Sequence, residues 1–156
     1  MNHPSIEKIW QHYRLEHPDA PETYDAWAFG DSEKMADDLL ELVLQGKKTA
    51  TASNYELYEV ENEPIPYEGL HNIILNGQGE AIAIIVTVAV DIVPFNEVSA
   101  DFAYLEGEGD RSLHYWREAH EAFFKREFAQ VNREFHEDMP VICEQFKLVY
   151  TGKTVN

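Results

Sequence analysis

The residues best suited to chemistry lie in one short segment, Gly-Lys-Lys-Thr-Ala-Thr at positions 46–51. Lys47 and Lys48 are the only lysines or arginines between Met35 and Asp110, an interval rich in carboxylates. Positive charge beside hydroxyl groups suits the capture of an anionic or polar ligand. The segment also follows an apolar helical pattern, and the negative end of a helix dipole attracts lysines without any further function. Both interpretations are open at this point.

The overall charge narrows the classes of ligand. The chain has 156 residues and a formal net charge of −17, so its long-range field repels nucleic acid. This disfavours double-stranded DNA and long RNA, whereas a nucleoside, a nucleotide or a short RNA held in a local groove remains compatible. No stretch approaches the ~20 apolar residues of a membrane span, and the N-terminus lacks a signal-peptide core. We therefore expect a cytoplasmic protein with no membrane partner.

Hydrophobic periodicity predicts the elements that must position the lysines. It predicts helices over residues 5–16, 32–45 and from 110 or 112 to about 128, and strands over 71–75, 80–93 and 141–150. Residues 49–51 suit entry into a further strand, residues 96–104 a loop with a short helical turn, and residues 106–110 a flexible acidic loop. In the strand at 80–93, Ile82 and the alternate residues up to Ile92 form one apolar face. The opposite face carries Ala81, Ala83, Ile85, Thr87 and Ala89, so we expect it to be covered as well.

The arrangement of these elements predicts an α+β fold. The strands at 71–75 and 80–93 flank a turn and form a hairpin, which favours antiparallel pairing and a strongly bent sheet or barrel. Two prolines separate the first helix from the rest of the chain. We therefore expect an N-terminal helical extension over residues 1–23 and a main domain over residues 24–152.

Several familiar sites are absent from the sequence. There is no glycine-rich phosphate loop, zinc-binding pattern or serine-hydrolase elbow, and the acidic loop lacks the spacing of a calcium loop. We expect neither a metal nor a cofactor. Cys143 is expected to be a buried small hydrophobe. Trp27 and Phe29 suit either the core or a stacking wall, and His120 suits a core position with satisfied hydrogen bonds.

A set of motifs in a fixed order resembles the ASCH domain family, and one bacterial branch of it in particular. The motifs cover about residues 24–150 and are Ala26-Trp27, Phe29-Gly30-Asp31, the segment from Leu44 to Thr51, Phe102-Ala103, the acidic stretch from Glu106 to Asp110, Trp116-Arg117 with His120, and Cys143-Glu144-Gln145-Phe146. The resemblance implies a PUA-like β-barrel of mostly antiparallel strands, with a cleft beside the first long helix. It also implies ligands of the nucleotide or RNA kind.

The resemblance further implies candidate catalytic residues. Some family members are regarded as RNA-binding or coactivator modules, some as ribonucleases, and one branch hydrolyses the acetyl amide of N4-acetylcytidine with a lysine, a threonine and a glutamate. By position in the motifs, these correspond to Lys48, Thr51 and Glu106, with Glu108 as a rival for the glutamate. This chain has an N-terminal helix and a longer aromatic helix than the shortest hydrolases, and these elements could narrow the cleft.

The chemistry leaves two assignments of the base open. A threonine hydroxyl is a weak nucleophile until a base accepts its proton. Lys48 can be that base only if desolvation lowers its pKa toward neutrality. If Glu106 lies close, Lys48 stays protonated and steadies a developing oxyanion, while Glu106 becomes the better base.

The alternative hypothesis is a binding module without turnover. In that case Lys47, Lys48, Arg111 and Arg117 would hold phosphates while Trp27, Tyr55 or Trp116 stacks on a base. A third hypothesis is an interaction domain with the family fold and no chemistry. The predicted substrate-binding residues are Trp27, Phe29, Lys47, Tyr55, Glu108, Arg111, Trp116, Arg117 and His120.

Overall fold

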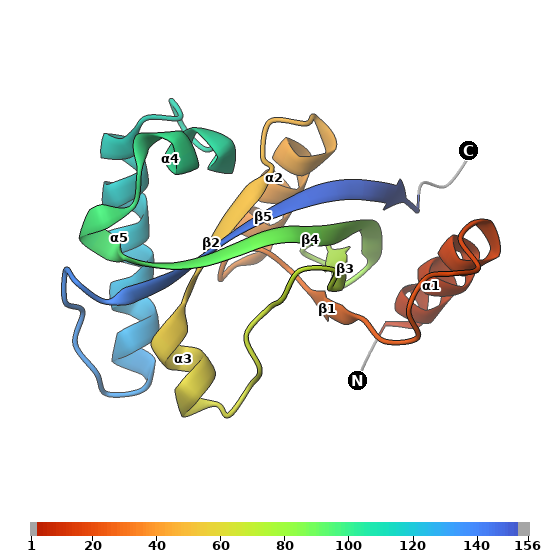
Figure 1. The fold of residues 1–156 in the computed structure, drawn as a ribbon, viewed down its shortest axis with the longest axis horizontal. Helices are drawn as coiled ribbons and strands as arrows, with labels where there is room; N and C mark the ends of the chain where they lie inside the picture. Colours follow the sequence, from red (N-terminus) through yellow and green to blue (C-terminus); the bar gives the residue numbers. More distant parts are fainter. Residues whose placement is uncertain (1–2, 153–156) are drawn as a thin grey trace.

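A computed structural model describes residues 3–152 as a curved five-stranded sheet with helices around it (Figure 1). The strand order is β1 (Asp25–Trp27), β3 (His71–Leu75), β4 (Ala81–Pro94), β5 (Pro140–Thr151) and β2 (Ala50–Asn54). β1 pairs with β3 in parallel, and the other neighbours pair antiparallel. The long strands β4 and β5 cross the whole molecule and join its two ends. The predicted α+β class is confirmed, with a half-barrel formed by a mixed sheet.

The helices lie around this sheet. They are α1 (Pro4–Glu16), α2 (Glu33–Leu44), α3 (Tyr55–Val60), the short 3-10 turn η1 (Phe95–Glu97), α4 (Ala100–Glu106) and α5 (Leu113–Gln130). The three long predicted helices are confirmed with ends shifted by a few residues. β1 and α3 were not predicted, because elements of three and six residues are too short to show a period. No helix within residues 3–152 is long and apolar enough to cross a membrane.

Helix α1 lies at the end of the molecule away from α4 and α5 (Figure 1). Its buried residues Ile6, Ile9 and Trp10 share a hydrophobic cluster with Ile73 and Ile84 of the sheet. Apolar burial of this kind is the main driving force for docking a helix. The N-terminal helix is therefore packed onto β3 and β4 and shares their core.

Two further clusters hold the helices that border the candidate site. Helix α2 packs on the sheet through Leu40 and Val43, which meet residues of β3, β4 and β5. Helices α4 and α5 pack on β2 and β5 through a cluster that includes Phe102, Trp116 and Phe124. The start of β2 therefore lies between two helical layers that are far apart in sequence.

One face of β4 is buried over only part of its length. Ile84 is fully buried, but Val88 and Ile92 on the same face are 41% and 48% exposed. The opposite face, expected to be covered as well, is buried at Ala83 and Thr87. The β4–β5 register shifts between Ile84 and Ile85 and again after Thr87. Each such irregularity disrupts the simple alternation of a regular strand, and of the two exposed residues Val88 lies at the second irregularity and Ile92 beyond it.

The acidic stretch expected to be a flexible loop is instead closely packed. Glu106 is the last residue of α4, and Gly107 adopts the left-handed conformation with φ 73°. A Cβ atom built on Gly107 would lie 2.3 Å from the carbonyl oxygen of Lys47. The turn after α4 is thus in direct backbone contact with the lysine segment.

This contact predicts that Gly107→Ala strongly destabilises the protein. The substitution combines a left-handed alanine with a backbone clash, and we expect a loss of about 2–4 kcal/mol of unfolding free energy in urea titrations. Gly46→Ala is the matched control, because Gly46 has φ 81° but nothing lies within 4 Å of its added Cβ. It should cost about 1 kcal/mol. Equal losses in the two variants would contradict the close contact at Gly107.

Candidate active site

Lys48 is placed by backbone contacts on both sides. Gly46 ends α2 with a left-handed conformation at φ 81°, as its position after the helix predicted, and the amide of Lys48 donates to the carbonyl of Leu42. The amide of Thr49 then donates to the carbonyl of Leu105 in α4. These contacts turn the Lys48 side chain inward, where the residue is only 2% exposed.

The Lys48 ammonium has three close acceptors. Its Nζ lies 2.6 Å from Oε1 of Glu106, 2.7 Å from Oε2 of Glu108 and 2.9 Å from the carbonyl oxygen of Ala50. An ammonium group has three hydrogens, so these three contacts use all of its donors. Burial alone would lower the pKa of Lys48, but the two carboxylates outweigh burial and raise it. Lys48 is therefore a charged donor and not a free base.

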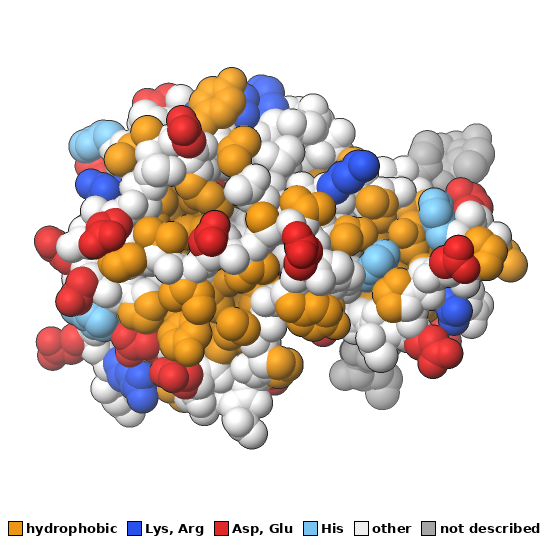
Figure 2. Space-filling model, in the orientation of Figure 1, with side chains coloured by type: hydrophobic (Ala, Val, Ile, Leu, Met, Phe, Trp, Pro, Cys, Tyr) orange, Lys and Arg blue, Asp and Glu red, His pale blue; other side chains and the backbone are white. Residues whose placement is uncertain are grey.

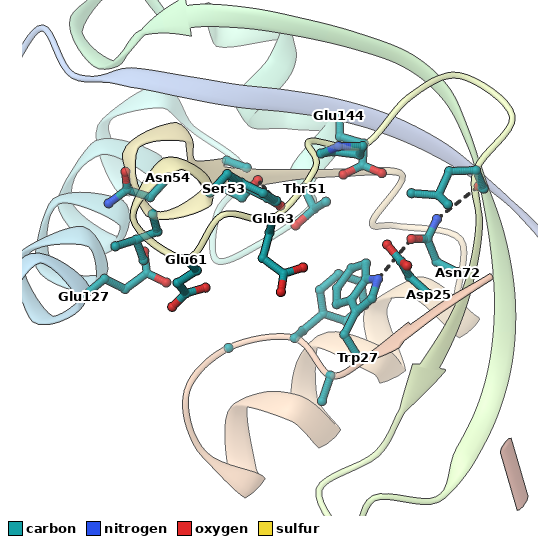
Figure 3. A pocket seen from close by; sticks show the side chains of 18 of the residues that line it. Asp25, Trp27, Thr51, Ser53, Asn54, Glu61, Glu63, Asn72, Glu127 and Glu144 are labelled. Atoms are coloured by element: carbon teal, nitrogen blue, oxygen red, sulfur yellow. Dashed lines mark hydrogen bonds between the residues drawn. The ribbon is translucent and has the colours of Figure 1, made fainter. Parts of the chain in front are cut away.

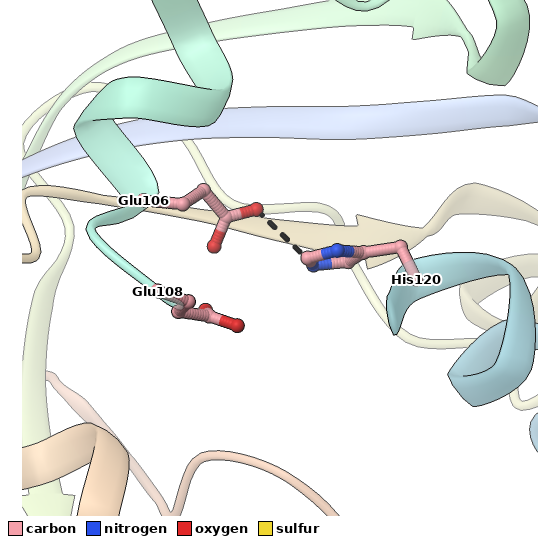
Figure 4. A group of neighbouring side chains, drawn as sticks. All are labelled: Glu106, Glu108 and His120. Atoms are coloured by element: carbon pink, nitrogen blue, oxygen red, sulfur yellow. Dashed lines mark ion pairs between the residues drawn. The ribbon is translucent and has the colours of Figure 1, made fainter. Parts of the chain in front are cut away.

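The Glu106 carboxylate accepts hydrogen bonds from side chains that are far apart in the sequence. Its second oxygen, Oε2, accepts the indole N–H of Trp116 at 2.8 Å and lies 3.3 Å from Nε2 of His120 (Figure 4). The other ring nitrogen of His120, Nδ1, lies 2.9 Å from the carbonyl oxygen of Trp116. Both nitrogens thus face acceptors, which only the doubly protonated imidazolium can satisfy.

The shifts in pKa agree with this charge state. Burial disfavours charge on both Glu106 and His120. For Glu106 the attraction of Lys48, followed by that of His120, outweighs burial, and for His120 the attraction of Glu106 does so. The pKa of Glu106 is lowered and that of His120 is raised. Burial raises the pKa of Glu108, and its ion pair with Lys48 only partly offsets this. The two glutamates therefore differ, since Glu106 is held ionised and Glu108 takes up a proton more readily.

Three of these side chains lie close enough to share a metal ion. Ligand atoms of Glu106, Glu108 and His120 fall within 4.8 Å of one another (Figure 4). The Lys48 ammonium already bonds to both carboxylates, and both nitrogens of His120 face acceptors. A metal would have to displace cations that belong to the chain, so the arrangement favours an internal charge network.

Lys48 and its partners border a small cavity. Its volume is about 90 Å³, and its lining includes Lys48, Thr51, Glu106, Glu108 and His120. All three predicted catalytic residues and the rival glutamate are thus brought to one cavity, although Glu106 lies some 58 residues from Lys48 in sequence. The strand β2 carries Thr51 into the lining directly after the lysine segment.

A larger cleft of about 470 Å³ adjoins this cavity (Figure 3). The two share the lining residues Phe29, Gly30, Thr51, Ala52 and Phe123. One wall of the cleft is the indole of Trp27, whose Nε1 donates to Oδ1 of Asn72 at 3.0 Å. Because this bond fixes the ring, Trp27 offers a preformed aromatic surface beside Thr51.

The structure divides the predicted binding residues into two groups. Trp27 and Phe29 line the cleft, and Glu108 and His120 line the small cavity. Lys47, Tyr55, Arg111, Trp116 and Arg117 line neither of them. Trp116 is 2% exposed and stacks on His120 at 4.2 Å, so it orients that ring and offers no face to a ligand.

The arginines have contacts within the chain. Arg111 lies over the ring of Tyr104 at 3.7 Å and donates to the carbonyl of Lys47. Arg117 donates to the carbonyl of Asn96 at 3.1 Å. These bonds tie neighbouring turns together, and neither guanidinium borders the cleft.

Several residues that line the cleft were not predicted as binding residues from the sequence. The carboxylates of Asp25, Glu61, Glu63, Glu127 and Glu144 and the hydroxyl of Tyr58 all line the cleft. They come from separate segments of a chain with 29 acidic residues. Glu144 belongs to one of the family motifs but was not predicted to bind a ligand, and the other four carboxylates are not marked by any motif. Only the alternation of β2, which sends Thr51 and Ser53 to one face, could have indicated that polar residues gather here.

The curved mixed sheet, with a lysine cavity beside α2, defines a PUA-like α+β protein. The chain belongs to the ASCH domain family, whose family model matches residues 25–150. No curated protein matches the chain.

Solved structures agree with this membership. The chain is 35% identical to an ASCH domain from Lactobacillus crispatus JV V101, with a TM-score of 0.89 and coverage of 96% of each chain. It is 40% identical to protein EF3133 from Enterococcus faecalis V583, described as DUF984, with a TM-score of 0.88 over 94% of this chain and 89% of that one. The hypothetical protein PH0355 shares the fold at 17% identity and a TM-score of 0.52, over 80% of this chain and 99% of that one.

The buried ion pairs predict unequal effects of two similar substitutions. Glu106→Gln leaves Lys48 and His120 buried with reduced compensation, and we expect a loss of about 3–5 kcal/mol in urea unfolding at pH 7. Glu108→Gln should cost less, since the Glu108 side chain is 16% exposed against 1% for Glu106. Because the folded pKa of Glu106 is lowered, its contribution is present above the unfolded pKa of about 4.3 and is lost as pH falls further. A smaller loss for Glu106→Gln than for Glu108→Gln would contradict the network.

Glu127 predicts a dependence on pH of the opposite sign. Burial, with Asp31 and Glu61 nearby, raises the pKa of this carboxyl to about 7. The folded state therefore binds a proton that the unfolded state has released, and stability falls as pH rises from the unfolded pKa of about 4.3 toward 7. Glu127→Gln should match the wild type at pH 4 and exceed its melting temperature at pH 8. Glu118→Gln, on the exposed side of the same helix, is the control and should show no such gain at pH 8.

Proposed function

We propose that this ASCH-domain protein binds a nucleoside-type ligand and hydrolyses an acyl amide of the N4-acetylcytidine kind. The observation that carries the proposal is the shared lining of the small cavity, where Lys48, Thr51, Glu106 and Glu108 meet. A nucleophile, a carboxylate and a fixed cation are the groups that amide hydrolysis requires. The family resemblance assigns the same residue types to this chemistry.

Thr51 and Glu108 suit the roles of nucleophile and base. Lys48 is unsuited to accept a proton, because its two carboxylate partners raise its pKa. Glu106 is a weak base because its pKa is lowered by Lys48 and His120 despite burial. Glu108 has a raised pKa and a partly exposed side chain, so it combines basicity with access to the cavity.

The proton transfer would also release a donor for the oxyanion. Thr51 Oγ attacks the carbonyl carbon, and its proton passes to Glu108. A neutral Glu108 attracts Lys48 less, which frees one ammonium hydrogen for the oxyanion that has just formed. Collapse breaks the C–N bond, and the leaving amine takes the proton back from Glu108. Water then attacks the acyl-threonine by the same route and releases the acid.

The volumes of the small cavity and the large cleft suit a substrate whose acyl group lies in the first and whose body lies in the second. About 90 Å³ corresponds to roughly three water molecules at ~30 Å³ each, which suits a small acyl group. The body of the substrate would extend past Thr51 into the cleft of about 470 Å³, beside Trp27 and Phe29. Aromatic walls of this kind favour a flat ring.

A second candidate function is the binding of a short RNA. Lys47 and Arg111 lie together on the surface, because the guanidinium of Arg111 donates to the carbonyl of Lys47. Tyr104, under Arg111, is 55% exposed and could stack on a base. This basic pair is confined to one spot, whereas acidic side chains outnumber basic ones on the face drawn in Figure 2. The surface as a whole therefore does not favour RNA.

Hydrolysis predicts a defined pattern among variants assayed for acetate release from N4-acetylcytidine. Thr51→Val and Glu108→Gln should each lower kcat/KM by about 100-fold or more, because each removes a group that acts in the reaction. Thr51→Ser should retain activity. The wild-type rate should fall on the acid side, as Glu108 becomes protonated below its raised pKa.

Lys47→Ala is the control, because its exposed side chain lies outside both cavities, and it should change the rate less than about twofold. No acetate release by the wild type would refute the hydrolase. Short-RNA binding that is lost in Lys47→Ala and Arg111→Ala would then support the second candidate. RNA cleavage that is lost in Thr51→Val would instead indicate a ribonuclease.

A further inference from the structure

The peptide bond between Thr51 and Ala52 lies where the two cavities meet. Both residues line the small cavity and the large cleft, and they follow each other in β2. β2 is an edge strand of the sheet that residues 3–152 form, with β5 as its neighbour. An edge strand directs part of its backbone away from the sheet, where those groups are free to bind a ligand. The register of β2 therefore decides which backbone groups the cavities receive.

The pairing of β2 with β5 sends the amide of Ala52 outward. The strands pair antiparallel, and residues in such a pair alternate between directing both backbone groups to the partner and directing both away from it. The amide of Phe146 in β5 donates to the carbonyl of Thr49 at 3.0 Å. In steps of two from Thr49, Thr51 and Ser53 also face β5. Ala52, between them, directs its N–H and its carbonyl away from β5.

A contact of Lys48 supports this direction. Its Nζ lies 2.9 Å from the carbonyl oxygen of Ala50, so Ala50 too faces away from β5. The next backbone group along the same edge is the N–H of Ala52. In the part of the chain that the structure describes, no side chain and no backbone group outside the strands accepts from this amide. The Lys48 ammonium and the Ala52 amide are thus neighbouring donors at the small cavity.

The Ala52 amide is also well placed for chemistry at Thr51. It belongs to the residue directly after the proposed nucleophile, and the residue after a nucleophilic serine supplies an oxyanion donor in the α/β-hydrolases. The Ala52 side chain packs against the hydrophobic cluster that holds α4 and α5 on the sheet. Because this packing and the adjacent ladder bonds fix the peptide plane, the donor needs no reorganisation when charge develops.

Lys48 alone leaves the site without a free donor at the start of the reaction. Its three hydrogens are already used by two carboxylates and a backbone carbonyl. One of them is released only after Glu108 has taken up a proton. The amide of Ala52 has no such competitor, so it can hold the substrate carbonyl before attack. It then holds the oxyanion more strongly, since a charged acceptor forms the stronger hydrogen bond.

We propose that the backbone N–H of Ala52 is the fixed oxyanion donor of this site. This role rests on the proposed function, amide hydrolysis at Thr51. As Thr51 Oγ bonds to the carbonyl carbon, its proton passes to Glu108 and the π electron pair of the carbonyl becomes a lone pair on the oxygen. The oxyanion then accepts from the N–H of Ala52. When the pair returns and the C–N bond breaks, Glu108 gives its proton to the leaving nitrogen, and the amide has neither gained nor lost one.

Replacement of Ala52 by lactic acid tests this role in the full chain. The change turns the amide into an ester, so it removes the N–H and keeps the side chain. The kcat for acetate release from N4-acetylcytidine should fall by about 100-fold or more. The urea midpoint of unfolding should stay close to that of the wild type, because this N–H lies outside the β2–β5 ladder.

The same replacement at Ile142 is the matched control. Ile142 lies opposite Ser53 in the register, and by the same alternation its amide faces β2. It is fully buried and lines neither cavity. Its α-hydroxy analogue should lower the urea midpoint and change kcat by less than about threefold. Equal losses of kcat in the two variants, or unchanged acetate release in the Ala52 variant, would overturn the proposed donor and leave the hydrolase intact.

Amide NMR of the wild type tests the geometry without turnover. In the free protein, the Ala52 amide should exchange with solvent at least about tenfold faster than the amides of Thr51 and Ser53, which the ladder protects. Methylboronic acid is the probe for the charged state. Its boron accepts the Oγ of Thr51, the proton passes to Glu108, and a tetrahedral anion results. The Ala52 amide proton should then shift downfield, and Thr51→Val should abolish this shift.

The NMR outcomes separate the donor from the reaction. Slow exchange at Ala52, or no shift with methylboronic acid, would overturn the proposed donor even if acetate is released. If the wild type releases no acetate, hydrolysis fails, whereas a Thr51-dependent shift at Ala52 would still support the donor.

Discussion

The buried pair of Lys48 and Glu106 is the constraint on which the candidate site depends. A buried ammonium and a buried carboxylate each carry a large desolvation cost, and only close, complete hydrogen bonding offsets it. Three acceptors surround the Lys48 ammonium. The Glu106 carboxylate accepts the indole N–H of Trp116 and lies beside the ring of His120. The structure therefore needs the end of α2, the end of α4 and the first turns of α5 in fixed positions. The Gly107 turn provides the close backbone approach that this arrangement requires.

The small cavity and the large cleft differ in how their charged side chains are balanced. In the small one, two cations and two carboxylates balance each other, so its groups are held in defined protonation states. In the large one, the carboxylates have no cationic partner within residues 3–152, and burial raises the pKa of Glu127 to about 7. The small cavity thus holds a balanced set of charges, whereas the large cleft keeps an excess of carboxylates.

Family membership and local geometry contribute different parts of the functional argument. Membership in the ASCH family agrees with the curved mixed sheet and its flanking helices. Geometry supports the proposed roles, because the contacts of Lys48 hold it as a charged donor and Glu108 is the more accessible of its two carboxylate partners. A fold hosts many functions, so the assignment depends on these side chains and not on the fold.

The sequence by itself determined the long elements and the ends that carry the site. Apolar periodicity located α2 and the hairpin, and Gly46 marked the helix end that precedes Lys48. The family resemblance brought Glu106 and Glu108 into consideration. Tertiary structure alone decided that Lys48 meets both glutamates across 58 to 60 residues of chain, because close pairing depends on how α2 and α4 pack. It also decided that both ring nitrogens of His120 face acceptors and that carboxylates gather in the cleft, since burial and proximity have no local pattern in sequence.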